Sequence, residues 1–442
     1  METFETISES SSLWDKGKLF IKCLVIFLMA MLLWIPTYFI MDVVKEREVH
    51  QKEAIADISG KWAGKQTVTG PLLMLPYKLE ETNDKGVKTT ETQYAYFMPD
   101  KLDIQSHVVP DKRKRGIYEV AVYKTDIQLK GMFNPIPWQK LEIPAEQIQW
   151  NEALLLFRIL DPAKGINEDL AIQWNDSSLV LTPQANGQTA LVEAFIAPVV
   201  ISPGTAARFS MNFSLNGSGQ LLFTAAAREN KIQMGSTWPD PAFTGMKLPD
   251  TREVKDSGFT ASWKYLNRTV PPVWKNSFYD LSAYQLGADL LIPVDTYDKT
   301  ERSVKYALLC IMLTFAAFFL VETIYKRTLH LVQYGLAGLA LVLFYTLLLS
   351  ISEYTGFNLA YLISGAATIG LVGWYMGSIL RSPKLALFIG FVLTVVYSYI
   401  FSIIQLQDYA LLMGSIGLFV ALGIIMFFSR KLEWDGRRRN GG

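Results

Sequence analysis

The sequence predicts a membrane protein, an α-helical bundle of six transmembrane helices with a large β-rich (α+β) domain inserted between helices 1 and 2. Composition supports this fold class, because the 442-residue chain is 50% hydrophobic and has a formal net charge of only +1. That combination is expected of a membrane protein with a sizeable soluble part. The apolar residues are also grouped, with one long run near the N-terminus and five near the C-terminus on either side of the polar segment 42–303.

The first apolar run, residues 23–41, follows a basic N-terminal segment and is followed by no small-x-small cleavage site. We therefore expect an uncleaved signal anchor at 23–41, after a cytoplasmic N-terminus of residues 1–22. The other five runs form a predicted five-helix bundle of residues 304–428, which precedes a cytoplasmic tail of residues 429–442. These five runs are residues 304–325, 331–351, 358–380, 385–404 and 409–428.

The short loops between these runs predict the orientation of the spans. The loops that contain Lys326 and Arg327, or Arg381 and Lys384, are basic, as are both termini, whereas the loops "SEYTGFN" and "QLQD" contain no Lys or Arg. Because Lys and Arg are enriched in short cytoplasmic loops, both termini are expected in the cytoplasm and residues 42–303 outside it.

Glu322 lies near the cytoplasmic end of the run 304–325, which contains eleven Leu, Ile, Val or Phe residues. Those residues favour insertion by about 5 kcal/mol, more than the roughly 3 kcal/mol that opposes a buried acid. Lys326 follows one turn later on the same helix face, so an interfacial Glu–Lys pair is the favoured interpretation. The alternative is an acid that faces the bundle interior and relays a proton or holds a headgroup amine. Glu353 and Asp408 are expected to be solvated loop ends on the external side.

Two predicted spans carry small residues at helical spacing. The intervals i, i+4, i+7 and i+11 place each set on one helix face, where neighbouring helices can approach closely. We therefore expect helix packing at these positions. They are Ala366, Gly370, Gly373 and Gly377 in one span and Ala410, Gly414, Gly417 and Ala421 in the other.

Residues 42–303 are predicted to be rich in β-strands. The stretch "FSMNFSLNGSGQLLF" alternates apolar and polar residues, breaks at Asn216-Gly217 and then resumes, which indicates a hairpin. "GFTASWKYL" alternates in the same way, and "QYAYFM" and "IYEVAVYKTDIQL" are further candidate strands. This many strands can bury a core as one or two packed sheets, and the one candidate boundary between subdomains is near Ser202.

The sequence contains no Gly-x-Ser-x-Gly, His-Glu-x-x-His or P-loop motif. The histidines are scattered, and Cys23 and Cys310 lie at different depths of their apolar runs, so we expect no metal, no cofactor and no disulfide. The near-zero net charge gives no reason to expect binding of nucleic acid. The basic run Lys112–Arg115 is interpreted as a charged turn between strands; the alternative is docking on anionic lipid headgroups or other envelope polyanions.

Three stretches of the chain form specific motifs: "STWPDPAFTG", with the pattern Trp-Pro-x-x-x-Phe-x-Gly, then "IPVDTYDK" and "LLLSISEYTGFN". In this order, and with these spans between them, they resemble the CreD family of bacterial inner-membrane proteins. "KWAGKQTVTGPLLMLPY" is similar as well, so the resemblance covers nearly the whole chain. The chain departs from the family at "TVPPVW", where the family more often has a glutamine after the first proline.

The resemblance implies a protein of the Gram-negative inner membrane with a periplasmic domain. The resemblance associates the chain with cell-envelope integrity and with a two-component system that responds to envelope stress or growth conditions. The resemblance implies no established catalytic residue. The resembling stretches contribute Trp238, Phe243 and Gly245 as candidate functional residues, and the helices contribute Glu322 and Glu353.

Two functions from different classes follow from these observations, and a third, an enzyme with an unrecognised site, is the weakest because the sequence contains no catalytic motif for it. We expect a non-enzymatic scaffold or binding role in envelope integrity, in which the external domain binds an envelope component or an envelope protein. The alternative is a carrier or lipid-handling membrane protein that uses the helical bundle, and Glu322, Glu353 and the small-residue stripes motivate it. A carrier requires a polar path through the bundle, whereas a scaffold requires an exposed binding face on the external domain.

Overall fold

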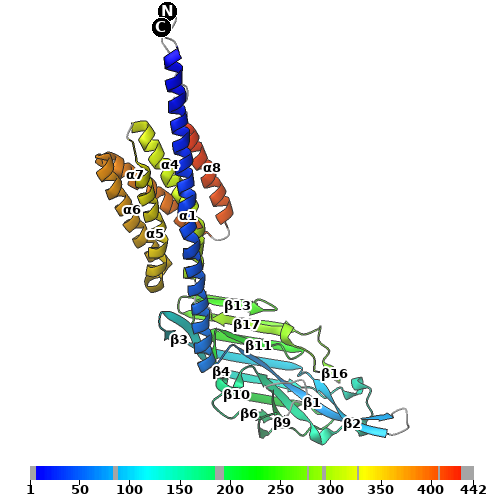
Figure 1. The fold of residues 1–442 in the computed structure, drawn as a ribbon. Helices are drawn as coiled ribbons and strands as arrows, with labels where there is room; N and C mark the ends of the chain where they lie inside the picture. The colour runs from blue at the N-terminus through cyan, green and yellow to red at the C-terminus, as the bar shows by residue number, and fades with distance from the viewer. Residues whose placement is uncertain are drawn as a thin grey trace, which may run out of the picture. The chain divides into compact units, whose positions relative to one another are not determined.

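The computed structural model describes residues 6–82, 88–184, 194–275, 278–290, 295–325, 328–406 and 409–429. The chain forms two compact units. The helical unit combines Met1–Gln51 with Val294–Gly442, and the β unit is Lys52–Pro293. Figure 1 labels the main helices and strands of both units.

The helices of the helical unit are mostly long and apolar. By length and composition, four of them can each cross a membrane, and α3 with α4 would supply a fifth span although they are bent by 45° relative to each other. The four are α1 (Thr6–Trp62), α5 (Leu331–Thr355), α6 (Phe357–Leu380) and α7 (Pro383–Gln405). The others are α3 (Asp295–Lys305), α4 (Ala307–Tyr325) and α8 (Ala410–Ser429).

The predicted count of six spans is therefore supported only in part. α8 is apolar and 20 residues long, but several of its side chains lie outside the described residues. The described residues support four or five spans, and a sixth stays a prediction.

Local sequence explains why α5, α6 and α7 follow one another so closely. His330 and Gln333 form a capping box at the start of α5, which satisfies backbone N–H groups that have no partner within the helix. α5 ends at Gly356, whose φ of 76° few other residues adopt readily. Pro383 occupies the first turn of α7, where a missing N–H costs nothing.

The β unit contains two sheets. The strands of the nine-stranded sheet are β1 (Gln66–Thr82), β2 (Lys88–Phe97), β5 (Leu154–Ile159), β8 (Thr182–Pro183), β9 (Ala194–Pro198), β11 (Gln220–Thr224), β13 (Pro241–Gly245), β16 (Val273–Lys275) and β17 (Gln285–Leu290). The strands of the eight-stranded sheet are β3 (Lys101–Arg115), β4 (Tyr118–Phe133), β6 (Ala171–Trp174), β7 (Ser177–Val180), β10 (Ala207–Ser218), β12 (Glu229–Ser236), β14 (Thr251–Lys255) and β15 (Gly258–Leu266). A single-turn helix, α2 (Pro162–Gly165), follows β5.

The order of the strands shows that the two sheets are interleaved along the chain. The nine-stranded sheet has the order β13-β17-β11-β1-β5-β9-β8, with β2 on β1 and β16 on β2, and the eight-stranded sheet has the order β14-β15-β12-β3-β4-β10-β6-β7. Most pairs are antiparallel, and the pairs β1–β11 and β3–β12 are parallel. Ser202 lies between β9 of one sheet and β10 of the other, inside one compact unit, so it is not a boundary between subdomains.

The inner faces of the two sheets share one hydrophobic core. The predicted alternation of β10 is confirmed, because Phe209, Met211 and Phe213 are buried while the residues between them are exposed. The rings of Phe213 in the eight-stranded sheet and Phe157 in the nine-stranded sheet meet edge to face, with centroids 5.7 Å apart. In β15, Trp263 is fully buried on the same inner face.

The hairpin predicted at Asn216-Gly217 is wrong. β10 continues through both residues and pairs with β4, whereas β11 pairs with β1 and β17 in the other sheet. The chain changes sheet at Gly219, whose φ is 70°. Gly217 is required for a different reason, since a Cβ there would overlap the ring of Tyr123 on β4. Long-range pairing has therefore replaced the local turn.

The strands also begin later than the predicted domain start at residue 42. α1 continues as a helix to Trp62, and the first strand begins at Gln66. At the other end the last strand stops at Leu290, and α3 begins at Asp295 before the predicted domain end at residue 303. Polar residues after the apolar run are still good helix formers, so the helix outlasts the hydrophobic stretch.

Gly245 offers a test of the sheet geometry, because its φ is 107° and an added Cβ would overlap the backbone carbonyl of Gln285 on β17. We expect Gly245→Ala to lower the stability of the β unit by about 2 kcal/mol. The measurement is thermal unfolding of the full-length protein in detergent, followed by tryptophan fluorescence. Gly204→Ala is the matched control, since Gly204 also has a positive φ but open space around it. Equal losses in the two variants would contradict the steric explanation.

Candidate functional site: a polar face on the eight-stranded sheet

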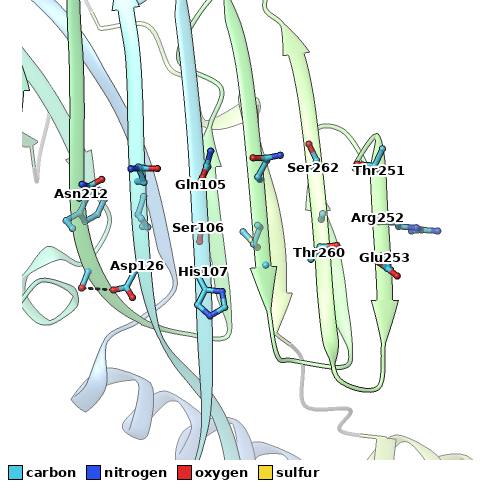
Figure 2. A pocket seen from close by; sticks show the side chains of 18 of the residues that line it. Gln105, Ser106, His107, Asp126, Asn212, Thr251, Arg252, Glu253, Thr260 and Ser262 are labelled. Carbon is cyan, nitrogen blue, oxygen red and sulfur yellow. Dashed lines mark hydrogen bonds between the residues drawn. The ribbon is translucent and has the colours of Figure 1, made fainter.

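The outer face of the eight-stranded sheet carries two rows of polar residues that run across six strands (Figure 2). The rows follow directly from the strand register. The first row is Thr251, Ser262, Gln233, Gln105, Gln128 and Asn212, on β14, β15, β12, β3, β4 and β10 in that order. The second row, one pleat along, is Glu253, Thr260, Gly235, His107, Asp126 and Ser214.

These residues line an open groove of about 1050 Å³. The outer face is polar because side chains alternate between the two faces of each strand. The residues between the polar ones therefore point inward and fill the core. On β4, for example, Asp126 and Gln128 are exposed while Ile127 and Leu129 are buried. The first row contains only amides and hydroxyls, which can both donate and accept hydrogen bonds. A long polar ligand can therefore be matched at many points.

The acidic residues of the groove lie in the second row or beside it. Ser214 donates its hydroxyl to Asp126 Oδ1 at 2.8 Å, and its backbone N–H bonds to Glu168 Oε1 at 2.7 Å. The β6 pairing with β10 stops at Met211, so Glu168 satisfies a backbone donor on a stretch of β10 that has no strand on that side. Both acids have a second oxygen and further lone pairs that remain exposed to the groove.

Asp250 holds the edge of the groove in place. Its carboxylate accepts hydrogen bonds from Lys247 Nζ at 2.5 Å and from the Lys264 backbone N–H at 2.7 Å, and its own N–H bonds to the Ser262 carbonyl. These contacts attach the start of β14 to β15. The Lys247 ammonium and the Lys264 N–H hold the pKa of Asp250 below its usual value.

Trp238, Phe243 and Gly245 lie away from the groove, where the chain passes from β12 in one sheet to β13 in the other. Trp238 is buried, and its indole N–H bonds to the Asp240 carbonyl at 3.2 Å. Phe243 packs edge to face against Phe259 and Trp263 on β15. These contacts join the two sheets, and a direct functional role for the three residues stays a prediction.

The basic run Lys112–Arg115 forms the end of β3 before a turn at Gly116. Arg113 lies over the Trp62 ring at 5.1 Å, and Arg115 pairs with Asp57, so the run contacts the end of α1. Lys112 lies over the Trp238 ring at 5.6 Å. The run therefore has the structural contacts expected of a charged turn.

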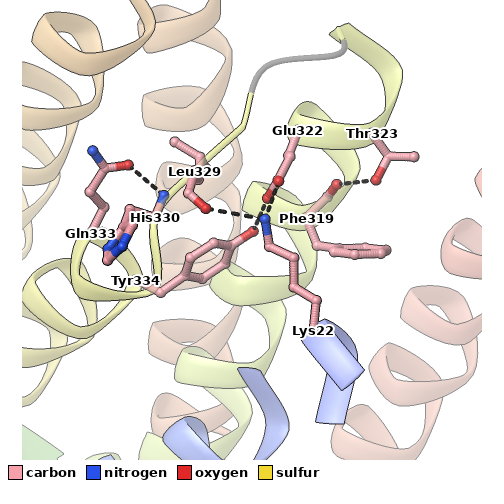
Figure 3. Close-up of polar contacts among 8 residues, drawn as sticks. All are labelled: Lys22, Phe319, Glu322, Thr323, Leu329, His330, Gln333 and Tyr334. Carbon is pink, nitrogen blue, oxygen red and sulfur yellow. Dashed lines mark hydrogen bonds and ion pairs between the residues drawn. The ribbon is translucent and has the colours of Figure 1, made fainter. Parts of the chain in front are cut away.

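Glu322 is the centre of a polar cluster in the helical unit (Figure 3). Its carboxylate pairs with Lys22 of α1 through Oε1 and accepts the Tyr334 hydroxyl at Oε2, at 3.1 Å. Lys22 Nζ also donates to the Leu329 carbonyl at 3.1 Å. The predicted partner Lys326 lies outside the described residues. An ion pair was expected here, and the structure supplies it from another helix.

Glu353 has a similar environment at the end of α5. Its Oε1 lies 3.6 Å from Arg47 Nε of α1 and accepts the Tyr297 hydroxyl at 3.3 Å. The side chain is only 11% exposed, so the expected solvated loop end is wrong for this residue. Asp408 lies outside the described residues. Each described acid is thus held by one cation from α1 and one buried tyrosine.

These two clusters attach α1 to the helical unit at two points. Along an α-helix Lys22 and Arg47 are about 37 Å apart, slightly more than a hydrocarbon core of about 30 Å. The ion pairs therefore lie near opposite ends of the apolar part of α1. Between them, α1 packs on α5 at Gly338, where a Cβ would overlap Leu33 of α1 and Phe315 of α4.

The positions of the two small-residue stripes differ in how closely a neighbouring helix approaches them. A Cβ added at Gly370, Gly373 or Gly414 would meet no described atom within 4 Å. Ala366 is exposed, and the α6 stripe borders a groove of about 580 Å³ beside α7. Gly370 is exposed as well, and Gly373 and Gly414 are half-buried, so close packing at these positions stays a prediction. A neighbouring helix does approach closely at Gly377, where an added Cβ would lie 3.1 Å from Ala386 Cβ, and at Gly417, where an added Cβ would overlap the Tyr399 ring.

The sequence did not single out the groove residues. A period-two signal was present, as in "DIQSHV" and "TDIQLK", but exposed amides and hydroxyls are ordinary on the solvent side of any strand. Only the register shows that six strands bring them into two rows. Among the described residues, no three His, Cys, Asp or Glu side chains converge where they could hold a metal ion, and Cys23 and Cys310 are free thiols.

The class of protein is therefore an α-helical membrane protein with a two-sheet β unit that exposes a polar face. The chain belongs to the CreD family, because the family model described as "Inner membrane protein CreD" matches residues 18–435. It is 30% identical over 431 residues to the inner membrane protein CreD of Escherichia coli (strain K12), and the match covers 95% of this chain and 94% of that protein. The resemblance seen in the sequence motifs is confirmed, and the chain is an inner membrane protein.

Solved structures show only weak likeness to this chain. A Legionella pneumophila aminopeptidase A in complex with aspartic acid matches with 13% identity over 51% of this chain and 27% of that chain, at a TM-score of 0.22. A putative protease from Parabacteroides distasonis matches with 12% identity over 68% of this chain and 58% of that chain, at a TM-score of 0.23. TM-scores this low bear on neither the fold nor the activity of this protein.

The Lys22–Glu322 pair can be tested by a double-mutant cycle. Glu322→Leu leaves the Lys22 ammonium without its acid, so we expect a loss of about 3 kcal/mol in stability. Adding Lys22→Met should recover most of that loss, because both charges are then gone. The measurement is thermal unfolding of full-length protein in detergent, with Lys45→Met, at an exposed position of the same helix, as control. A double variant no more stable than Glu322→Leu would contradict the pairing.

Asp250 gives a pH-dependent prediction. Because its pKa is lower in the folded protein than in the unfolded chain, its contribution is present above the unfolded pKa and is lost as pH falls through the folded pKa. We expect Asp250→Asn to be less stable than wild type at pH 7, by at most about 1 kcal/mol since the site is exposed and screened. The difference should shrink to zero in acid. Unfolding measured between pH 7 and pH values below about 3.9 checks this, and a difference independent of pH would contradict it.

Proposed function

We propose that this protein maintains the cell envelope without enzymatic chemistry, by binding an envelope component on the outer face of its eight-stranded sheet. In this proposal α1 is an uncleaved anchor, the helical unit crosses the inner membrane six times, and both termini are cytoplasmic. Residues 42–303 are then periplasmic, so the polar face meets the envelope directly. The single observation that carries the proposal is the open groove lined by two polar rows across six strands.

The chemistry of the groove favours binding over catalysis. The first row offers neutral donors and acceptors at the strand spacing of about 4.8 Å, which suits a long polar polymer better than a small substrate. Six strands at that spacing give a row about 24 Å long. Many modest hydrogen bonds of this kind give specificity by their number and spacing.

The helical unit favours an anchoring role for the two acids that motivated the carrier alternative. Glu322 and Glu353 are each engaged by a cation of α1 and by a tyrosine hydroxyl. A proton relay or headgroup site needs carboxylates that can exchange partners. Carboxylates that are already paired and hydrogen-bonded are better suited to holding α1 in register with the other helices than to relaying a proton or binding a headgroup.

The proposal predicts that envelope function depends on the groove and tolerates the loss of charge at Glu322. We expect the double variant Gln105→Ala/Gln128→Ala to fail to restore a deletion strain, scored by dye leakage and by detergent and β-lactam sensitivity. Glu322→Gln, which keeps the hydrogen-bonding shape, should restore it. The same proteins should be compared for co-sedimentation with purified envelope sacculi, where the groove variant binds about tenfold less.

Gln139→Ala is the matched control, because Gln139 is an exposed amide of the same unit that does not line the groove. All variants must reach wild-type levels in the membrane. If the groove variant restores the strain and Glu322→Gln does not, the carrier alternative replaces this proposal.

A further inference from the structure

A second pocket of about 500 Å³ adjoins the groove on the same outer face of the eight-stranded sheet. It is formed by the next two rows of the register. One row contains Lys231, Asp103, Lys130 and Ser210, on β12, β3, β4 and β10. The following row contains Glu229, Lys101, Met132 and Arg208 on the same four strands. The two pockets are therefore successive parts of one face.

The second pocket is basic, in contrast to the groove. Its lining includes four cations and two acids. Two of the cations form ion pairs with these acids, Lys231 with Asp103 and Lys101 with Glu229, each at 3.9 Å. Within the described part of the chain, no carboxylate oxygen lies within 4.0 Å of the other two cations, Lys130 and Arg208, although Asp103 is the cross-strand neighbour of Lys130. These two are diagonal neighbours on β4 and β10, because Lys130 lies opposite Ser210. Their positive charges are available to an anion.

The groove has the opposite balance. Its lining contains three carboxylates, on Asp126, Glu168 and Glu253, against one guanidinium, on Arg252. In Figure 2 Arg252 lies at the outer edge of β14. Asp126 accepts the Ser214 hydroxyl of the neighbouring strand. Two of the three acids, Asp126 on β4 and Glu168 bonded to Ser214 of β10, therefore lie at the same two strands that carry Lys130 and Arg208.

Strand β4 orders these charges along a single line. Asp126, Gln128 and Lys130 are successive outward residues of β4, so an acid, an amide and a cation follow one another. At about 3.4 Å per residue, the acid and the cation are about 14 Å apart. The neutral row lies between them and keeps them from neutralising each other. From Asp126 to Lys130, β4 thus presents an acidic end and a basic end with a hydrogen-bonding strip between them.

We propose that this face recognises a polymer that carries both ammonium and carboxylate groups, held about 14 Å apart on a hydroxyl- and amide-rich backbone. The ammonium lies at Asp126 and Glu168, the backbone lies along the neutral row, and the carboxylate lies at Lys130 and Arg208. A glycan substituted with short peptides has this chemistry. The inference rests on the proposed envelope-binding function and adds the class of ligand and its direction on the sheet.

Charge complementarity distinguishes this ligand from others. A purely anionic polymer would be repelled by the acids of the groove, and a neutral glycan would leave both charged ends without a partner. Arg208 suits a carboxylate particularly well, because its guanidinium can donate two parallel hydrogen bonds to it. The available acids, Asp126 and Glu168, are acceptors only and so match an ammonium group.

The test uses full-length protein in detergent and a soluble glycan–peptide fragment released from sacculi. Its affinity is measured by calorimetry in three forms: unmodified, with the amines acetylated, and with the carboxylates amidated. We expect each modification to weaken binding to wild type about tenfold. Lys130→Gln/Arg208→Gln should bind the unmodified fragment about tenfold more weakly and lose only the sensitivity to amidation. Asp126→Asn, which can still accept from Ser214, should lose only the sensitivity to acetylation.

Lys140→Gln is the matched control, because Lys140 is an exposed cation of the same unit and lines neither pocket. It should behave as wild type. Binding that is lost in the Gln105→Ala/Gln128→Ala variant but indifferent to both modifications would overturn this inference and leave the proposed function intact. No binding of any form, together with full complementation by the Gln105→Ala/Gln128→Ala variant, would overturn both.

Discussion

Strand register in the eight-stranded sheet is the constraint on which both the core and the candidate site depend. Side chains alternate between the two faces, so each strand contributes to the core and to the polar face at the same time. On β10, Phe209, Met211 and Phe213 fill the core, while the residues between them form the outer rows. A slip of one residue would bury the polar rows and expose the aromatic ones. The stability of the β unit therefore maintains the geometry of the groove.

The helical unit meets a different constraint, since charges in an apolar environment must be paired. Glu322 and Glu353 are satisfied by Lys22 and Arg47 of α1, with help from two buried tyrosines. Removing one member would leave an uncompensated charge, which costs more than the pair contributes. Such ion pairs contribute more to the position of a helix than to the stability of the folded protein. They give α1 a defined register against α4 and α5.

Three conspicuous residues of the sequence, Gly217, Gly245 and Trp238, have packing roles that explain their identity. Gly217 admits the Tyr123 ring, Gly245 admits a β17 carbonyl, and Trp238 fills the passage between the sheets. The groove residues are the reverse case, because they have no packing role on the outer face. An exposed row of amides that the core does not need is a better candidate for function than a buried aromatic.

The sequence by itself determined the membrane class, the apolar runs and the β-rich segment, because hydropathy and alternation are local properties. The family followed from specific motifs and from the similarity of nearly the whole chain. The sequence also determined which residues of β10 and β15 face inward. Only the tertiary structure decided that β10 pairs with β4 instead of turning at Gly217, that Glu322 pairs with Lys22, and that Gly370 of α6 is exposed. Each of these depends on contacts between residues far apart in the chain. The polar face belongs to the same group, since its rows exist only once six strands are in register.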